Sequence, residues 1–158
     1  GRLVTDWLTG GIDPAPVAPA SPLNGFNLLI ADHRAARFVS NHPQPVSLAL
    51  PDGVHGLSNG EREPPWPKTR VLTGALADWL AGPAEDVAPL FGALRRDAPL
   101  PGEGPAPRLS SVFIADPVYG TRCSTIMAIG HDGQGVVVER RFSPQALPSG
   151  ETRLAFRW

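Results

Sequence analysis

Charge of either sign is scarce in this sequence and is evenly balanced. Fourteen lysines and arginines stand against fifteen aspartates and glutamates among 158 residues, which gives a formal net charge of -1. Charged residues make up 18% of the chain, below the roughly 25% that is usual in soluble domains. This balance offers no basic surface for a polyanion, so we expect neither a nucleic-acid partner nor attraction to an anionic membrane.

Cysteine and long apolar runs are also scarce. The one cysteine, Cys123, excludes a disulfide within the chain and suits a reducing compartment, so we expect a cytoplasmic protein. No apolar run approaches the roughly 18 residues of a membrane helix, which predicts that the chain has no membrane span.

Recognised metal and phosphate motifs are missing as well. The histidines at 33, 42, 55 and 131 form no HExxH pair, and one cysteine cannot complete a zinc site. Neither GxGxxG nor GxxxxGK[ST] occurs, so no glycine-rich loop for phosphates is predicted. We therefore expect no metal site.

Proline and glycine, in contrast, are plentiful, with 19 and 17 residues in short clusters between apolar runs. Such clusters indicate turns and loops. Apolar residues at 3, 4, 7 and 8 predict an opening helix that ends near residues 10–11. Apolar spacing also predicts helices over about 68–81 and 84–96, and Pro89 should delay or kink the second of these. The predicted strands are 26–32, 36–40, 45–50, 54–59, 110–115, 124–129, 136–141 and 152–158, with a hairpin turn over 131–135.

Strands followed by helices and then by more strands favour an α+β fold, in which helices pack outside antiparallel sheets. At this length we expect a single domain over residues 1–158. The first helix begins without a capping residue, as if the chain were entered within an element. We therefore expect that the N-terminal part of a larger sandwich is missing and that a sheet strand is left unpaired.

Polar side chains at glycine-marked bends beside strands are the candidate ligand-binding residues. An amide can donate to a developing oxyanion, and arginine can pair with a carboxylate or a propionate. The alternative is structural, with Asn59 capping a loop and Arg122 pairing with a surface carboxylate. Because both sit at strand-edge bends, we expect the side-chain ends of Asn59 and Arg122 within about 12 Å of each other. The candidates are Asn24, Asn27, Ser58, Asn59, Trp66, Tyr119, Thr121 and Arg122.

Several of these segments resemble the NRDE family, also called the transport and Golgi organisation protein 2 family. The match follows the family's order over nearly the whole chain. It is carried by residues 2–5, 24–28 with 31–32, 56–59 with 65–68, 119–122 with 124–126, 139–141 and 151–153.

The resemblance implies an αββα sandwich like that of the N-terminal-nucleophile hydrolases. In such proteins the nucleophile is a cysteine that becomes the N-terminal residue when the initiating Met is removed. By the same resemblance, Asn59 would stabilise an oxyanion and Arg122 would lie in the active site. The family's better-supported role is haem trafficking. This chain departs from the pattern because residue 1 is Gly and the Asn-Arg-Asp-Glu motif is not among its residues. An internal cysteine such as Cys123 cannot replace an N-terminal one, whose α-amine acts as the base.

Three functions remain after these observations. The first is haem binding or trafficking, with haem as cargo, Arg122 near a propionate, and His55, Tyr119 or Cys123 as candidate iron ligands. The second is an amidohydrolase that uses Asn59 and Arg122, with its nucleophile on the missing part. The third is a non-catalytic interaction protein. We expect a small-molecule ligand, haem or an amide, and the missing N-terminal part of the same protein as partners.

Overall fold

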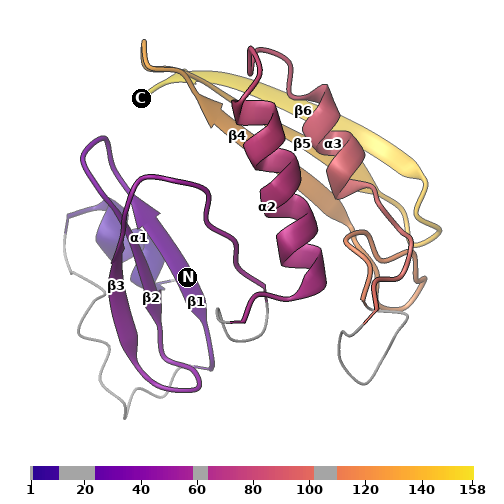
Figure 1. Ribbon diagram of the computed structural model, residues 1–158, viewed down its shortest axis with the longest axis horizontal. Helices are drawn as coiled ribbons and strands as arrows, with labels where there is room; N and C mark the ends of the chain where they lie inside the picture. The colour runs from indigo at the N-terminus through magenta and orange to yellow at the C-terminus, as the bar shows by residue number, and fades with distance from the viewer. Residues whose placement is uncertain (1, 11–23, 59–63, 102–109) are drawn as a thin grey trace. The chain divides into compact units, whose positions relative to one another are not determined.

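The computed structural model describes residues 2–10, 24–58, 64–101 and 110–158. It divides into two compact units, residues 1–53 and residues 54–158, each described here by itself (Figure 1). The expectation of one domain over the whole chain stays a prediction.

The first unit is a short helix and a three-stranded antiparallel sheet in the order β1-β2-β3. Its elements are α1 (Arg2–Leu8), β1 (Asn27–Ala31), β2 (Ala36–Ser40) and β3 (Val46–Leu50). Alternation along the strands places Phe38 between Leu29 and Leu48 in one cross-strand row. Phe38 is buried, while both leucines are exposed, so one row of this sheet stays apolar and accessible.

The second unit packs two helices against one face of another antiparallel sheet, in the order β4-β5-β6 (Figure 1). Its elements are α2 (Pro67–Leu80), α3 (Ala88–Leu94), β4 (Cys123–Ile129), β5 (Gln134–Phe142) and β6 (Pro148–Arg157). Ile126 and Val138 face the helices and form the core with Val87 and Phe91. This burial of apolar area is what holds the helices to the sheet.

The opposite face of the same sheet is different. Met127 and Leu154 lie on either side of Val137 in one cross-strand row, and each is 60% exposed. The edge strand β6 is exposed along nearly its whole length. The α+β class with antiparallel sheets is confirmed, by two three-stranded antiparallel sheets and a few helices. Within the described ranges, no helix is both long and apolar enough to cross a membrane.

Two predicted strands are wrong. Residues 54–58 have no regular structure, and the end of that predicted strand, Asn59, lies outside the described residues. Residues 110–115 contain a bend over 111–113 and no strand, because their polar groups bond within loops. The Ser111 hydroxyl donates to the Phe113 carbonyl at 2.6 Å, and the Phe113 N–H donates to the Arg96 carbonyl at 2.8 Å. These hydrogen bonds engage the Phe113 carbonyl and N–H, which pairing with a neighbouring strand would require.

The helix predicted from residue 84 begins at Ala88 instead. Ala84 has a φ of 53°, in the left-handed region that a helix cannot contain, and Pro89 lies in the first turn of α3. Proline is tolerated there because the first helical N–H groups have no partner within the helix. The hairpin turn over residues 131–135 joins β4 to β5 as predicted.

Candidate functional site

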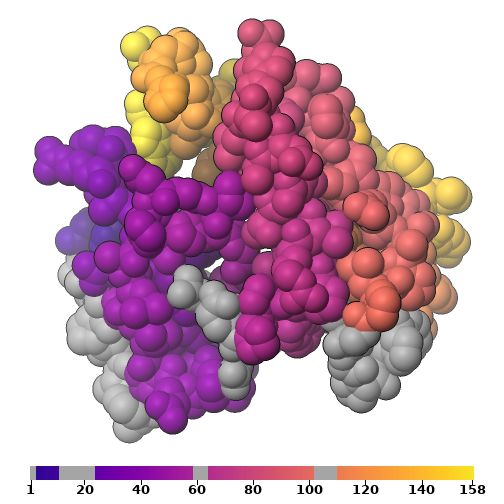
Figure 2. Space-filling model, viewed as in Figure 1, coloured from indigo at the N-terminus to yellow at the C-terminus, as the bar shows by residue number. Residues whose placement is uncertain are grey.

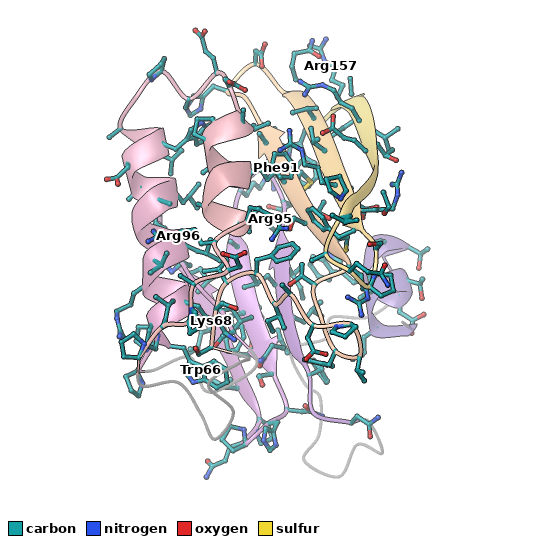
Figure 3. The ribbon with its side chains drawn as sticks, turned by 90° about the vertical axis from the view of Figure 1, so that its right-hand side faces the viewer. Trp66, Lys68, Phe91, Arg95, Arg96 and Arg157 are labelled. Carbon is teal, nitrogen blue, oxygen red and sulfur yellow. The ribbon has the colours of Figure 1, made fainter. Side chains whose placement is uncertain are left out.

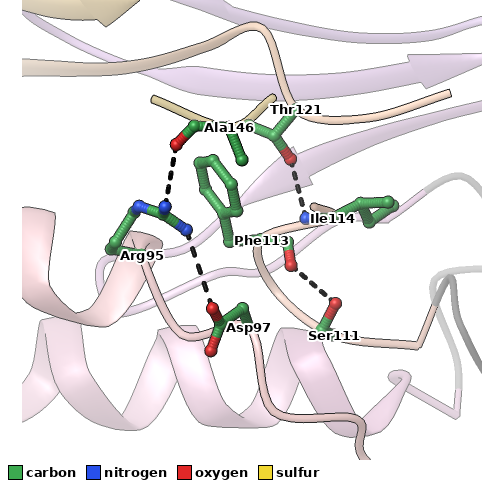
Figure 4. A network of polar contacts seen from close by, with 7 residues as sticks. All are labelled: Arg95, Asp97, Ser111, Phe113, Ile114, Thr121 and Ala146. Carbon is green, nitrogen blue, oxygen red and sulfur yellow. Dashed lines mark hydrogen bonds and ion pairs between the residues drawn. The ribbon is translucent and has the colours of Figure 1, made fainter. Parts of the chain in front are cut away.

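The segment Tyr119–Arg122 closes a loop that begins at residue 114 (Figure 4). The Thr121 N–H donates to the Ile114 carbonyl at 2.9 Å, and the Ile114 N–H donates to Thr121 Oγ1 at 3.0 Å. The Arg122 guanidinium donates to the carbonyls of Asp116 and Pro117, with its shortest bond at 3.0 Å. Arg122 therefore braces the backbone, an arrangement that neither interpretation of the sequence included.

Position 120 requires glycine because the backbone of the same loop passes very close to it. A Cβ atom at this position would lie 2.4 Å from the Asp116 carbonyl oxygen and 2.8 Å from the Ile114 carbonyl oxygen. Tyr119, next to it, is 60% exposed. In the segment 119–122, the Tyr119 side chain is therefore open to solvent. Gly120, Thr121 and Arg122 shape the loop.

The loop carries Phe113 into a small second core. The Phe113 ring is fully buried and meets the Phe142 ring edge-on at 4.8 Å between centroids. The Arg95 guanidinium lies over Phe113, 3.7 Å from its centroid, and Nη2 of Arg95 donates to the Ala146 carbonyl at 2.9 Å. Figure 4 shows Thr121 bonded to Ile114, the neighbour of Phe113, with the Arg95 guanidinium beside the Phe113 ring.

The segment His55–Ser58 lies against the start of α2. A Cβ atom on Gly56 would come within 2.4 Å of Thr69 Cγ2, so the backbone of this segment touches the helix. Ser58 and Lys68 line a cavity of about 330 Å³ there, and the Lys68 ammonium stands 4.9 Å from the Trp66 ring centroid. Figure 3 shows Trp66 and Lys68 at the beginning of α2.

One pattern in this segment was overlooked in the sequence. Residues 56–60 have the spacing Gly-x-Ser-x-Gly, which in α/β-hydrolases forms a turn between a strand and a helix. Residues 54–58 are not a strand, and α2 begins only at Pro67. The described part of this segment therefore lacks the local structure that would expose Ser58 as a nucleophile.

The predicted site residues fall into separate groups. Asn24 and Asn27 belong to the first unit, where the Asn24 carbonyl accepts from the Asn41 amide at 3.2 Å. Ser58 lines the cavity beside α2, whose described lining includes neither Thr121 nor Arg122. Asn59 lies outside the described residues, so its expected closeness to Arg122 stays a prediction.

A larger groove, of about 740 Å³, lies along β4 between the two helices and the edge of the sheet. Figure 2 shows this hollow between the orange turn after β4 and helix α2. Leu76 and Leu94 belong to its walls, and Met127 and His131 line its sheet side. Sequence reasoning missed this site.

Comparison with known proteins gives the family. Residues 1–144 match the family described as transport and Golgi organisation 2. This chain belongs to that family. The transport and Golgi organization protein 2 homolog of Homo sapiens is 32% identical over 180 residues, which cover 97% of this chain and 65% of the human protein. The Bos taurus homolog is 31% identical over 89% of this chain and 60% of its own length.

The resemblance seen in the motifs is thereby confirmed at the level of the family. The chain spans less than two thirds of the curated relatives that it matches. What the whole protein does is therefore a matter for proposal.

Proposed function

We propose that this chain binds haem, in keeping with the haem-handling role that its family resemblance implies, and that haem lies in the groove between α2, α3 and β4. The observation that carries the proposal is a groove of about 740 Å³ with apolar walls and an imidazole at its rim. Its volume falls within the roughly 300–1,000 Å³ typical of small-molecule sites.

The groove supplies the two things that a tetrapyrrole needs from a protein. Its walls are leucines and an indole, and Trp79 is fixed there because its Nε1 donates to the Asp86 carbonyl at 2.7 Å. On the sheet side, His131 offers an imidazole, a side chain that holds haem iron in many proteins. It is exposed, so iron can reach it without unfolding of the core.

The propionates would lie at the open side of this groove. No arginine or lysine occurs among its described lining residues, so the carboxylates would meet water there. Arg122, the propionate partner that we expected from the sequence, does not line the groove either. A direct bond from Arg122 to a propionate stays a prediction, and His131 replaces His55, Tyr119 and Cys123 as the preferred iron ligand.

Haem titration followed by absorbance tests the proposal. His131→Ala should weaken haem binding at least roughly ten-fold, about 1.4 kcal/mol, and shift the visible spectrum, because an iron ligand is lost. His33→Ala is the matched control, since His33 is also an exposed turn histidine but lies in the first unit. Equal affinity and equal spectra for wild type and His131→Ala would remove the groove from the proposal.

The hydrolase and interaction-protein alternatives stay predictions. The αββα sandwich that the family resemblance implies belongs with the hydrolase alternative and stays a prediction with it. If wild type failed to bind haem at all, the hydrolase would become the better hypothesis.

A further inference from the structure

A second cavity in the unit of residues 54–158, of about 390 Å³, is lined by three arginines and one glutamate. Three guanidinium groups against one carboxylate leave two positive charges in excess on its lining. We propose that this cavity binds the oxyanion group, a carboxylate or a phosphate, of a small ligand. The residues that carry the argument are Arg95, Arg140, Arg141, Glu151, Phe91 and Ser124.

Two of the arginines are held in place by aromatic rings. The Arg95 guanidinium lies over Phe113, and the Arg140 guanidinium stands 4.0 Å from the centroid of Phe91. Figure 3 shows Phe91 and Arg95 along α3. A planar guanidinium that is already packed loses little further freedom when it binds an anion, so the two side chains are preorganised.

The arginines differ in how fully their donors are used. Nε of Arg140 donates to Glu151 at 2.8 Å, and Nη1 of Arg141 donates to Glu139 at 3.2 Å and to Thr152 at 2.8 Å. Among the described residues, Arg95 has Asp97 as its one ionic partner, at 3.9 Å, which is too long for a hydrogen bond.

Nη1 of Arg95 is buried and has no hydrogen-bond partner in the part of the chain that the structure describes. This donor does not border the cavity, so the contribution of Arg95 to the site is the positive charge of its guanidinium. An oxyanion in the cavity would be attracted by that charge and would accept from the N–H groups of Arg140 other than Nε.

The size of the cavity limits the ligand. A volume of about 390 Å³ lies near the lower end for small-molecule sites, which favours a compact carboxylate or phosphate monoester. Carboxylate and phosphate both match the fork of a guanidinium in two parallel hydrogen bonds. The cavity shares none of its described lining with the haem groove, so this inference does not rest on the proposed function.

Thermal denaturation of the haem-free chain can test the site with inorganic phosphate, acetate and benzoate as probes. Each is titrated at constant ionic strength, with sodium chloride as the reference salt, because screening alone changes stability. Binding to the folded state should raise Tm with a saturable dependence on phosphate, on a carboxylate, or on both. The anion that saturates at the lowest concentration identifies which oxyanion the site prefers.

Variants decide whether the arginines are responsible. Arg140→Gln should weaken anion binding roughly ten- to a hundred-fold, because it loses a charge-assisted hydrogen bond. The control is Arg157→Gln, which removes the same charge from the exposed end of β6 outside the cavity. If no probe raised Tm beyond the chloride reference, or if Arg157→Gln weakened binding as much as Arg140→Gln, the inference would be overturned.

Discussion

Replacing Thr121 by valine should destabilise the chain although valine fills almost the same volume. The hydroxyl of Thr121 is the acceptor for the Ile114 N–H at 3.0 Å, and the bond is partly buried. Valine cannot accept this bond, so the Ile114 N–H would lose its partner, at a cost of about 1–3 kcal/mol for a buried group. Because this group is only partly buried, we expect about 1–2 kcal/mol.

Urea denaturation followed by tryptophan fluorescence measures this cost. Three of the four tryptophans, Trp66, Trp79 and Trp158, lie in the same unit as the loop. With a slope of roughly 2 kcal/mol per molar urea, Thr121→Val should lower the midpoint by about 0.5–1 M. Thr121→Ser keeps the hydroxyl and should lose less than Thr121→Val. A serine variant as unstable as the valine variant would refute the hydrogen-bond reasoning.

Two further predictions concern Gly120 and Asp32. Gly120→Ala should cost roughly 1–3 kcal/mol in urea denaturation, since its Cβ would meet the Asp116 carbonyl oxygen at 2.4 Å. Gly74→Ala, in α2 with open space around the added Cβ, should instead stabilise by up to about 1 kcal/mol, and a similar loss in both variants would contradict the steric argument. Hydrogen bonds from the backbone N–H groups of Arg34 and Ala35 lower the pKa of Asp32 in the folded state. The ionised carboxylate therefore stabilises the fold above the unfolded-state pKa of about 3.9. This stabilisation is lost as the pH falls through the lower folded-state pKa. The stability difference between wild type and Asp32→Asn, measured from pH 2 to pH 7, should therefore shrink below about pH 4, and a difference that is constant with pH would count against an ionised Asp32.

The regular elements with a strong apolar period could be predicted from the sequence. In β4 the alternation is simple: Ser124 and Ile126 are buried toward the helices, and Thr125 and Met127 are exposed. A strand of this kind has one buried face, and its side chains alternate between the two faces. The alternation of apolar and polar residues therefore identifies the buried face even when the neighbouring strands are unknown. The same reasoning placed α2 to within one residue at each end.

The run 110–115 shows why the period alone was insufficient. Its apolar residues suit a strand, but two serines precede them, and serine hydroxyls compete for backbone groups. The Ser110 hydroxyl accepts from the Leu100 N–H at 3.0 Å, and the Ser111 hydroxyl donates to the Phe113 carbonyl. Phe113 is buried as an apolar residue should be, but in a loop. The pair of serines was the signal available in the sequence.

The candidate sites depended on contacts that no local pattern contains. Arg95 reaches the Ala146 carbonyl across 51 positions, and the groove along β4 is lined by residues of α2, α3 and β4 that lie far apart in the sequence. The motif residues Thr121 and Arg122 were placed correctly at a bend, but their partners were not predicted. Those partners are backbone carbonyls and an N–H within the same loop.

A residue in a family motif can therefore influence a ligand without touching it. Thr121 and Arg122 close the loop that positions Phe113, and the Phe113 ring supports the Arg95 guanidinium at the arginine-lined cavity. Loss of anion binding in Thr121→Val would not show that Thr121 is a ligand contact, because the same variant lowers stability. Arg140 gives the opposite pattern, since its side chain is 43% exposed and its loss should weaken binding with little effect on unfolding. Only when stability and affinity are measured on both variants can a positioning residue be separated from a residue that contacts the ligand.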